Sequence, residues 1–531
     1  RREGGKVFDS GSHATVAVTF LVKDPAHEGP AVLHYRDIGD YLSREDKLRI
    51  VEESQIDTLE WETITPNAQG DWINQRDPNY ESWQSIGEGQ APVFASYTAG
   101  VQTNRDAWVY NFSLPGLRDS AQRLIETYNE ERECVHRTRA ADLKAGAKVR
   151  DLVTNDETRI KWTSGLFSDL AKNRAISYDA GATYCGLYRP FCKQWLNASD
   201  GIIYLPAVLR RYFPTPGHDN VGFYLVGQGS DVPFSTVMTD TAPNLHVTGA
   251  GSGGQFFPRW TWEPVGGRHA AEAGMLDLSG GEDTEESGAT VGQEGEVLGG
   301  YRRVDNITDA TLRSYQAAYG PEVTKDDVFY YVYALLHSPE YRTRYGADLK
   351  KSLPHIPLVA SREDFVAFTT AGRGLADLHL DYESVEPTPL GLAVDGQDVP
   401  WDLRETISPT LLHVEKMRYD HLQSNKKQAD KTSIVYNEHV TISGIPAQAQ
   451  DYLLGSRSGL DWLLERYRVS THKASGIIND PNDWMAEGAG GGPTASAQPL
   501  YLLDLIARIT TVSVQTQEIV NSLPPLDVKP T

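Results

Sequence analysis

Cysteine is scarce in this chain of 531 residues, and its scarcity already excludes some classes of protein. The three cysteines, Cys134, Cys185 and Cys192, form no CxxC pair and have no histidine at zinc-binding spacing. We therefore expect neither a disulfide framework nor a zinc site, and a reducing cytoplasm is the expected compartment. The longest apolar run, residues 14–22, is too short to cross a membrane. The sequence predicts no membrane or export role.

Motifs that handle nucleotides are also missing. The chain contains no G-x-x-x-x-G-K-[ST] loop for ATP. It also lacks an Asn-Pro-Pro-Tyr type of tetrapeptide, which an adenine methyltransferase needs to hold a flipped base. The glycine-rich string at residues 249–254 is similar to a dinucleotide loop, but Pro258 would stop the helix that such a loop leads into. We expect no catalytic residue, cofactor site or metal site in this chain itself.

Charge is unevenly distributed along the sequence. The chain has 50 basic and 72 acidic residues, for a net charge of −22, which repels phosphate. Acidic residues concentrate at 282–296, and basic residues concentrate in two other regions. The first basic cluster contains Arg132, Arg137, Arg139, Lys144, Lys148, Arg150, Arg159, Lys161, Lys172 and Arg174, and the second contains Lys416, Arg418, Lys426, Lys427 and Lys431. Each cluster is either a solvated helix face or the lining of a groove that binds a nucleic acid duplex.

The first part of the chain predicts two strands and a helix. Residues 14–22 and 31–38 are rich in apolar and β-branched residues and are separated by a proline- and glycine-containing loop, so we expect an antiparallel pair. Ser43 with Asp46 three residues later predicts the start of a helix whose buried side carries Leu48, Ile50 and Val51. The texture changes after Trp61, and a domain boundary is expected between about 60 and 90.

The remaining chain predicts a mixed α/β body. Residues 117–128 and parts of 144–174 are expected to be helical, and 184–237 to form strands separated by turns. The glycine-rich and acidic stretch at about 249–300 predicts a flexible insertion. Thr324 with Asp327, and Ser338 with Pro339, are typical of helix starts. The last helix, residues 500–520, places its apolar residues on one side and is expected to pack in the core.

Several strings together resemble one family, the single-polypeptide type ISP restriction-modification enzymes. The most informative string is residues 188–196, Tyr-Arg-Pro-Phe-Cys-Lys-Gln-Trp-Leu, followed by Gly-Gln-Gly-Ser at 227–230. Further matching strings occur in order at residues 4–12, 35–42, 64–67, 103–108, 233–235, 238–240, 324–331, 435–438, 478–484 and 522–525. The resemblance covers nearly the whole chain.

This resemblance implies a domain organisation and a function. Residues 1–75 would be the last strands and helix of a Rossmann-like methyltransferase sheet with a linker. Residues 76–531 would be an α/β target recognition domain with a helical C-terminal part. The expected function is sequence-specific recognition of double-stranded DNA, which positions a target adenine for methylation and licenses cleavage of unmodified DNA. The resemblance implies methyltransferase, helicase and nuclease domains upstream in the same polypeptide, which would use S-adenosylmethionine, ATP and Mg²⁺. We expect the chain to be one part of that longer polypeptide.

The candidate DNA-binding residues are those whose side chains suit bases or phosphates. Arg and Lys suit guanine and phosphate, Asn and Gln suit adenine, and small polar groups suit phosphate. The candidate residues fall into four groups. One is a turn in the first third of the chain, one is part of the first basic cluster, one lies among aromatic residues, and one lies at or near the second cluster. These are Asn104, Arg105 and Asp106, then Lys172 and Arg174, then Arg189 and Lys193, and finally Lys431 and Asn437. Each could instead be structural, since Arg105 could pair with an acid and the neighbouring aromatics could be core residues.

Two alternatives remain open. Asp377, His379, Asp381 and Glu383 would share one side of a strand and could hold a divalent cation for a nuclease, whereas on a helix His379 would face away from the two aspartates. The chain could also be a non-catalytic assembly protein of a phage-defence complex. That alternative predicts no affinity for DNA and an exposed apolar patch.

Overall fold

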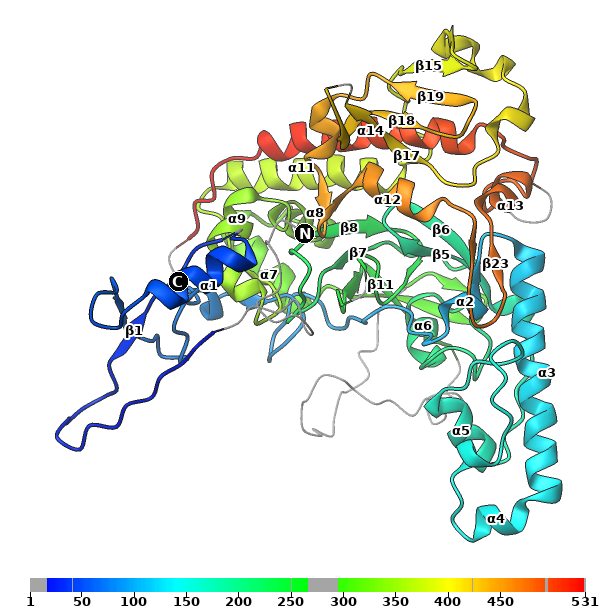
Figure 1. Ribbon diagram of the computed structural model, residues 1–531, viewed down its shortest axis with the longest axis horizontal. Helices are drawn as coiled ribbons and strands as arrows, with labels where there is room; N and C mark the ends of the chain where they lie inside the picture. Colours follow the sequence, from blue (N-terminus) through cyan, green and yellow to red (C-terminus); the bar gives the residue numbers. More distant parts are fainter. Residues whose placement is uncertain are drawn as a thin grey trace. The chain divides into compact units, whose positions relative to one another are not determined.

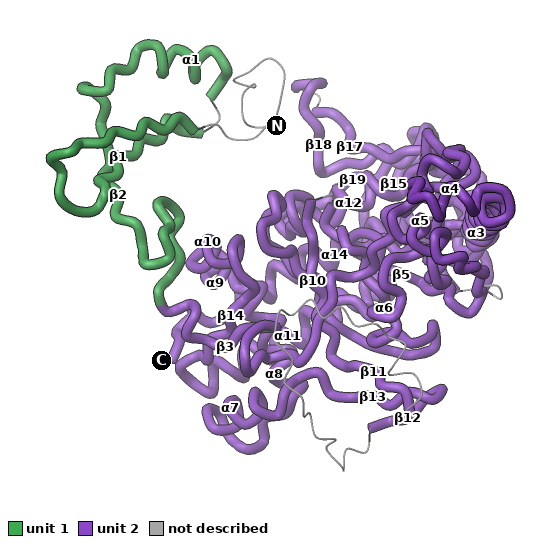
Figure 2. Tube along the Cα trace, turned by 90° about the horizontal axis from the view of Figure 1, so that it is seen from below, with its two compact units in different colours: residues 1–78 green, residues 79–531 purple. Residues whose placement is uncertain are grey.

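The computed structural model describes residues 17–40, 42–249, 251–265, 295–422, 424–491 and 495–529. The chain divides into two compact units, residues 1–78 and 79–531 (Figure 2). The first matching string, at residues 4–12, and most of the expected insertion at 249–300 lie outside the described residues.

The first unit contains a short antiparallel pair, but its partners differ from those expected. Strand β1 (Leu33–Tyr35) pairs with β2 (Glu62–Ile64), and Leu33 lies opposite Ile64. Residues 17–22 form no strand, and their side chains are exposed, Leu21 by 90%. The predicted pairing of 14–22 with 31–38 is therefore wrong. A strand with apolar side chains on both faces needs cover on both faces, and the described part of this unit supplies none.

The helix of the first unit begins where the sequence predicts. Helix α1 (Arg44–Glu53) has Ser43 as its N-cap, and the Ser43 hydroxyl accepts a hydrogen bond from the Asp46 amide at 3.1 Å. In the described residues no side chain of α1 is fully buried, and Val51 is 62% exposed. The predicted buried side of this helix is thus not buried within the described chain.

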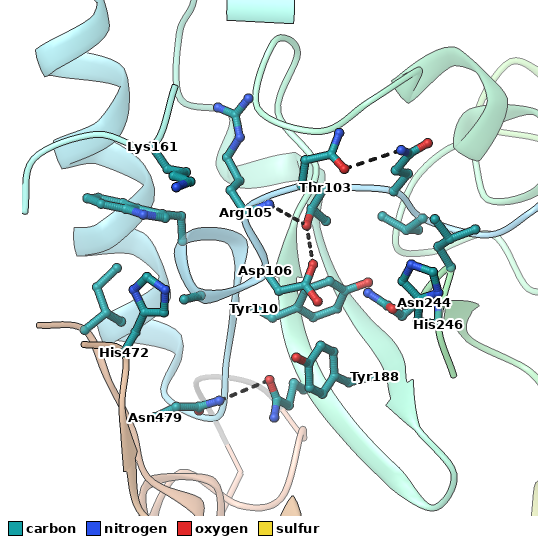
Figure 3. Close-up of a pocket in the computed structure, with 18 of the residues that line it drawn as sticks. Thr103, Arg105, Asp106, Tyr110, Lys161, Tyr188, Asn244, His246, His472 and Asn479 are labelled. Carbon is teal, nitrogen blue, oxygen red and sulfur yellow. Dashed lines mark hydrogen bonds between the residues drawn. The ribbon is translucent and has the colours of Figure 1, made fainter. Parts of the chain in front are cut away.

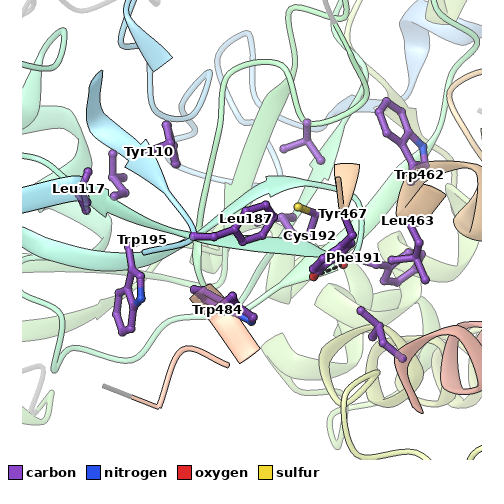
Figure 4. Packing of buried hydrophobic residues seen from close by; sticks show 14 of the residues in the cluster. Tyr110, Leu117, Leu187, Phe191, Cys192, Trp195, Trp462, Leu463, Tyr467 and Trp484 are labelled. Atoms are coloured by element: carbon purple, nitrogen blue, oxygen red, sulfur yellow. Dashed lines mark hydrogen bonds between the residues drawn. The ribbon is translucent and has the colours of Figure 1, made fainter. Parts of the chain in front are cut away.

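A four-stranded sheet lies at the centre of the second unit. Its order is β4-β6-β5-β9, and it is built on the antiparallel hairpin of β5 (Thr183–Arg189) and β6 (Cys192–Asn197), flanked by β4 (Tyr110–Asn111) and β9 (Ala242–Pro243). Phe191 in the hairpin turn adopts a left-handed conformation, with φ of 56°, while its side chain is buried. Figure 4 shows Phe191 and Trp195 packed among other buried aromatic residues of this core.

Two further sheets follow in the chain. The first has the order β10-β7-β8, and the second has the order β11-β13-β12. Their strands are β7 (Gly222–Leu225), β8 (Thr236–Thr239), β10 (Gln255–Pro258), β11 (Trp260–Pro264), β12 (Val297–Leu298) and β13 (Tyr301–Asp305). The glycine-rich string at 249–254 therefore leads into strand β10 rather than into a helix, as the position of Pro258 predicts.

Three long helices pack together beside these sheets, with α11 (Arg362–Leu380) in contact with both α8 (Lys325–Leu335) and α14 (Tyr501–Asn521). Thr324 and Asp327 form the expected capping box of α8, and Ser338 caps α9 (Pro339–Arg344). Apolar residues of α14 such as Leu502 and Ile509 are fully buried, which confirms the predicted core helix. The smaller helices α7 (Asp309–Tyr319) and α10 (Gly346–Leu349) lie in the same part of the chain.

Two segments extend from this body: a helical arm, seen in Figure 1, and a two-stranded ribbon, seen in Figure 2. The helical arm, residues 114–174, comprises α3 (Leu114–Thr138), α4 (Ala140–Lys144) and α5 (Ser164–Ala171). The ribbon, residues 418–435, is the hairpin of β17 (Arg418–Leu422) and β18 (Asn425–Val435). It belongs to a five-stranded sheet with β15 (Gly391–Val394), β16 (Gln397–Val399) and β19 (Val440–Ser443). Of the described residues of β18, only Ile434 and Val435 pair with β19, so residues 420–422 and 425–430 form a two-stranded extension.

Short elements complete the second unit. The helices are α2 (Asp106–Val109), α6 (Pro206–Tyr212), α12 (Gly459–Arg466) and α13 (Pro481–Ala486). The strand pairs are β3 (Gln84–Ser85) with β14 (His355–Ile356), β20 (Leu453–Leu454) with β21 (Arg457–Ser458), and β22 (Ser470–Thr471) with β23 (Ile478–Asn479). The mixed α/β class predicted from the sequence is confirmed. Among the described helices, none has the length and apolarity of a membrane span.

Candidate functional site

The second unit contains a pocket of about 540 Å³ where five separate segments meet (Figure 3). Its lining includes residues 101–110 around helix α2, Lys161 of the arm, two residues of the β5–β6 hairpin, residues 244–246, and parts of 470–479. The predicted residues Asn104, Arg105 and Asp106 all line it. The volume lies within the roughly 300–1,000 Å³ that small-molecule pockets usually have.

The turn that carries these three residues is held by its own hydrogen bonds. The Thr103 hydroxyl donates to the Asp106 carboxylate and accepts from the Arg105 amide at 3.1 Å. Asn104 has a left-handed backbone, with φ of 56°, which asparagine tolerates better than most residues, and its side chain is exposed. In the described residues no ion pair joins Asp106 to a basic side chain. The structure therefore presents an amide and an unpaired carboxylate from one rigid turn.

Arg105 connects this turn to the helical arm. Its side chain is only 6% exposed, and one guanidinium nitrogen, Nη2, donates to the hydroxyl of Thr163, the N-cap of α5. Burial lowers the pKa of Arg105 to about 10. Nε and Nη1 have no hydrogen-bond partner among the described residues, and no acid there pairs with Arg105. The pairing with Asp106 that the sequence left open is not formed.

Arg189 is buried and contacts two residues that line the pocket, Tyr188 and Asn244. Its guanidinium carbon lies 4.0 Å from the centre of the Tyr188 ring, and Nη1 donates to the side-chain oxygen of Asn244 at 3.2 Å. Tyr188 and Asn244 line the pocket, whereas Arg189 is buried and does not. Burial raises the pKa of Tyr188 and lowers that of the neighbouring His246. Arg189 therefore positions two lining residues and is not itself placed at the surface.

The remaining rim carries further polar groups. The Asn479 amide donates to Gln194 at 3.3 Å and accepts from the Phe112 backbone amide at 2.8 Å. His472 bonds to Ser475 at 2.8 Å, and the Lys161 ammonium pairs with Glu157 at 2.7 Å. Amides, a carboxylate, an imidazole and an ammonium group from remote parts of the sequence thus line one concave surface.

The first basic cluster lies on the helical arm, where half of its members pair with acids. Arg174 contacts Asp169 at 3.2 Å, and similar ion pairs occupy Arg132, Arg139, Arg159 and Lys161. Lys172 is exposed at the end of α5, and no ion pair is formed by Lys172, Arg137, Lys144 or Lys148 within the described residues. The arm is therefore partly a solvated, internally paired surface and partly a source of free cations.

Two predicted residues have structural partners. The Lys193 ammonium lies 2.6 Å from Glu383, and both side chains are mostly buried. The Asn437 amide donates to the carbonyls of Leu411 and His413 at 2.7 and 2.8 Å, and its oxygen accepts from two backbone amides. These bonds hold a turn. Neither residue lines the pocket.

Lys431 and the rest of the second cluster lie on or beside the ribbon. Lys431 pairs with Asp461 at 3.0 Å and lies over the Tyr419 ring. Lys426 and Lys427 are exposed on the two-stranded extension, and within the described residues they form no ion pair. The two-stranded extension of the ribbon therefore carries free positive charge beyond the part of β18 that pairs with β19.

The geometry of the proposed nuclease site is not present. Asp377 and His379 lie on helix α11, and Asp381 is its C-cap. His379 is buried, bonded to Tyr333 and Thr516, and burial lowers its pKa to about 3. The strand alternation that this alternative required is thus wrong. Across the described residues, no group of three His, Cys, Asp or Glu side chains is placed to hold a metal ion.

Several lining residues were missed by sequence reasoning. Asn244, His246 and His472 stand in short strings that carry no recognisable pattern of their own. Gln194 and Asn479 do fall within the matching strings at 188–196 and 478–484, and that shared membership was the signal that could have placed them at one site.

Comparisons with known proteins agree on one family. The family model of the type ISP C-terminal specificity domain matches residues 92–505. No curated protein sequence matches this chain. Solved structures do match, among them a nuclease-deletion mutant of the type ISP restriction-modification enzyme LlaGI in complex with a DNA substrate mimic. It has 30% identity and a TM-score of 0.71, and the match covers 94% of this chain and 40% of that chain.

Two further structures give similar values. The ATP-dependent type ISP restriction-modification enzyme LlaBIII bound to DNA has 26% identity and a TM-score of 0.71, with 96% of this chain and 28% of that chain covered. The DrdV–DNA complex has 26% identity and a TM-score of 0.68, with 93% and 43% covered. The chain spans less than half the length of each of these proteins. Because the family model covers most of the sequence, this chain belongs to the type ISP C-terminal specificity domain family.

Proposed function

We propose that this chain recognises a specific sequence of double-stranded DNA, as the specificity region of a restriction-modification enzyme. The observation that carries the proposal is the surface around the pocket. It combines the exposed amide of Asn104, the unpaired carboxylate of Asp106 and the Lys161 ammonium. Hydrogen bonds from such groups to base edges discriminate base pairs in the major groove. The DNA-bound type ISP structures that this chain resembles support the proposal.

The arm and the ribbon are suited to contact the DNA backbone on either side of the pocket. The arm is joined to the pocket by the bond between Arg105 and Thr163. The base of the ribbon is joined to it through a β-bridge between Lys416 and Arg468, two residues before the lining strand β22. Free lysines on the ribbon and the arm would supply sequence-independent attraction to phosphate. This arrangement is compatible with a protein whose net charge is negative.

The experiment that tests the proposal is selection from a randomised duplex pool. The purified chain is mixed with the pool at moderate salt, and the bound DNA is sequenced and then selected again at higher salt. We expect one enriched motif that survives the increase, and a changed preference at one or two positions for Asn104→Ala. Retention of DNA without any enriched motif, or with a motif that Asn104→Ala and Lys161→Ala leave unchanged, contradicts base reading by this surface.

The wider roles implied by the family depend on the remainder of the polypeptide. Recognition by this chain would position a target adenine for an S-adenosylmethionine-dependent methyltransferase and would license cleavage by ATP-driven helicase and Mg²⁺-dependent nuclease domains. Most large apolar side chains exposed in the described residues belong to the first unit, including Phe20, Leu21, Val51 and Trp61. An apolar surface of this kind is suited to packing against another protein segment. We propose that the upstream portion of the methyltransferase domain covers these exposed apolar side chains.

A further inference from the structure

The concave form of the pocket is unusual for a surface that only reads a stacked duplex. The major groove, about 12 Å wide, is read by convex elements that enter it, such as a helix or a two-stranded ribbon. A cavity of about 540 Å³ instead has the size of a site that encloses a small ligand. Its lining includes two aromatic residues with exposed surface, Tyr188 and His472, while the Trp108 side chain that also borders it is buried. Aromatic walls with polar groups between them are how proteins hold a base that has left the helix.

Asp106 indicates which chemical group would enter. Its carboxylate receives one hydrogen bond, from Thr103, and within the described residues no basic side chain neutralises it. Such a group repels phosphate, so the backbone of the DNA is not its natural partner. The exocyclic amines of cytosine and adenine are donors that a carboxylate accepts from. Guanine and thymine would place a carbonyl oxygen against it at the corresponding edge.

Other polar groups of the lining are suited to form hydrogen bonds with the rest of the base edge. Figure 3 shows Asp106 between Tyr110, Tyr188 and Lys161, with Asn479 and Asn244 on either side. Asn244 is fixed by Arg189, and Asn479 is fixed by the Phe112 amide. Both amides are therefore held in place before any ligand arrives, which reduces the ordering that binding requires.

We propose that the pocket receives a single amine-bearing nucleobase, adenine or cytosine, displaced from the bound duplex, and that Asp106 accepts a hydrogen bond from its amine. The inference rests on the proposed DNA recognition and assigns one specific ligand to that site. Displacing a base costs a few kcal/mol of stacking and pairing, and the cost is least at a mismatch. The pocket should therefore make the protein prefer a duplex with a mismatch at one position.

The test uses the duplex sequence selected from the randomised pool. Binding is measured for the perfect duplex and for duplexes that carry one mismatch at each position in turn. We expect a mismatch that frees adenine or cytosine to tighten binding by about tenfold at a single position. Asp106→Asn should reduce that gain to less than about twofold, because the amide offers the incoming amine a donor as well as an acceptor. Asp119→Asn, an exposed acid of α3 outside the pocket, is the matched control and should keep the full gain.

The outcomes separate this inference from the proposed function. Specific binding of the perfect duplex without a mismatch gain at any position overturns the base pocket and leaves DNA recognition intact. A gain that persists in both Asp106→Asn and Tyr188→Leu overturns it as well. Binding of free dAMP or dCMP that depends on Asp106, without a mismatch gain, assigns the pocket to a free nucleotide. Absence of binding to any duplex overturns both proposals.

Discussion

The guanidinium group of Arg105 donates a hydrogen bond to the Thr163 hydroxyl and thereby joins the wall of the pocket to the first turn of helix α5. Thr163 also accepts from the Leu166 amide as the N-cap of that helix. This hydrogen bond joins two residues 58 positions apart and links the pocket wall to the helical arm. Loss of this bond has different consequences for its two partners. Arg105 is buried, and its other donors have no partner in the described residues.

We expect Thr163→Val to be more destabilising than Arg105→Met. The valine leaves the buried guanidinium unsatisfied, at about 1–3 kcal/mol, and removes a helix cap worth about 1 kcal/mol. Methionine removes the buried charge together with its unmet donors, so its cost should be smaller. Urea unfolding of each variant gives the free energies. Thr163→Ser keeps the hydroxyl and should lie within about 0.5 kcal/mol of the parent. A larger loss for Arg105→Met than for Thr163→Val contradicts this account.

Neutralising the ribbon should weaken DNA binding without changing the selected sequence. Lys426 and Lys427 are exposed and lack ion pairs in the described residues, so each is available to one phosphate. In Lys426→Gln/Lys427→Gln we expect the slope of log affinity against log salt to become smaller by about 1–2. The control is Lys350→Glu, which changes the net charge by the same amount at an exposed site outside the ribbon. It should leave the slope unchanged. Loss of one position from the selected motif would instead mean that the ribbon reads bases.

Local elements were predictable because their signals are local. The capping box of Thr324 and Asp327 lies within four residues, and hydrogen bonds across so short a span require no tertiary contact. The strand predicted at residues 14–22 failed for the complementary reason. Its apolar pattern fits a strand covered on both faces, and that cover must come from elsewhere. Pattern alone therefore identifies a segment that needs a partner without showing whether the partner is present.

The site was predictable only in part for the same reason. The turn at 103–106 was identified from its residue types, and it does line the pocket. The same residue types predict a DNA contact for Lys193, but Glu383, 190 residues away, pairs with it. They also predict a DNA contact for Asn437, whereas its amide holds a turn. Ion pairs and side-chain bonds over such distances in the chain depend on packing, which residue type and spacing do not reveal.

Acid should weaken the second unit through its buried histidines. Burial lowers the pKa of His379 from 6.5 to about 3. The unfolded chain therefore binds this proton at a higher pH than the folded chain does. The contribution of His379 to the free energy of unfolding is fully present above pH 6.5. It falls as the pH decreases toward 3, by at most about 1.4 kcal/mol per pH unit. In His379→Gln we expect a lower free energy of unfolding at pH 7 and a flatter decline from pH 6.5 to pH 4, measured by urea unfolding.

The exposed His439 provides a control of opposite sign. A hydrogen bond to Asp395 raises its pKa, so its contribution is present below pH 6.5 and is lost as the pH rises through the folded value. The difference between the parent and His439→Gln should therefore be largest in acid and vanish at alkaline pH. Parallel curves for the parent and His379→Gln between pH 6.5 and 4 contradict a buried neutral histidine.

Two glycines of helix α11 should respond in opposite ways to the same substitution. A Cβ at Gly372 would lie 1.9 Å from the backbone oxygen of Tyr330 in α8, so the two helices would have to move apart. Overpacking of this kind costs typically about 1–3 kcal/mol. At Gly374 the nearest atom is the end of the flexible Ile519 side chain, 3.3 Å away. Gly374→Ala should therefore be neutral or stabilising by up to about 1 kcal/mol, because alanine favours a helix interior. Urea unfolding measures both variants. The selected DNA motif should be the same for both variants, because neither residue lines the pocket. Equal effects on the free energy of unfolding would mean that the close approach of α8 and α11 at Gly372 does not limit stability.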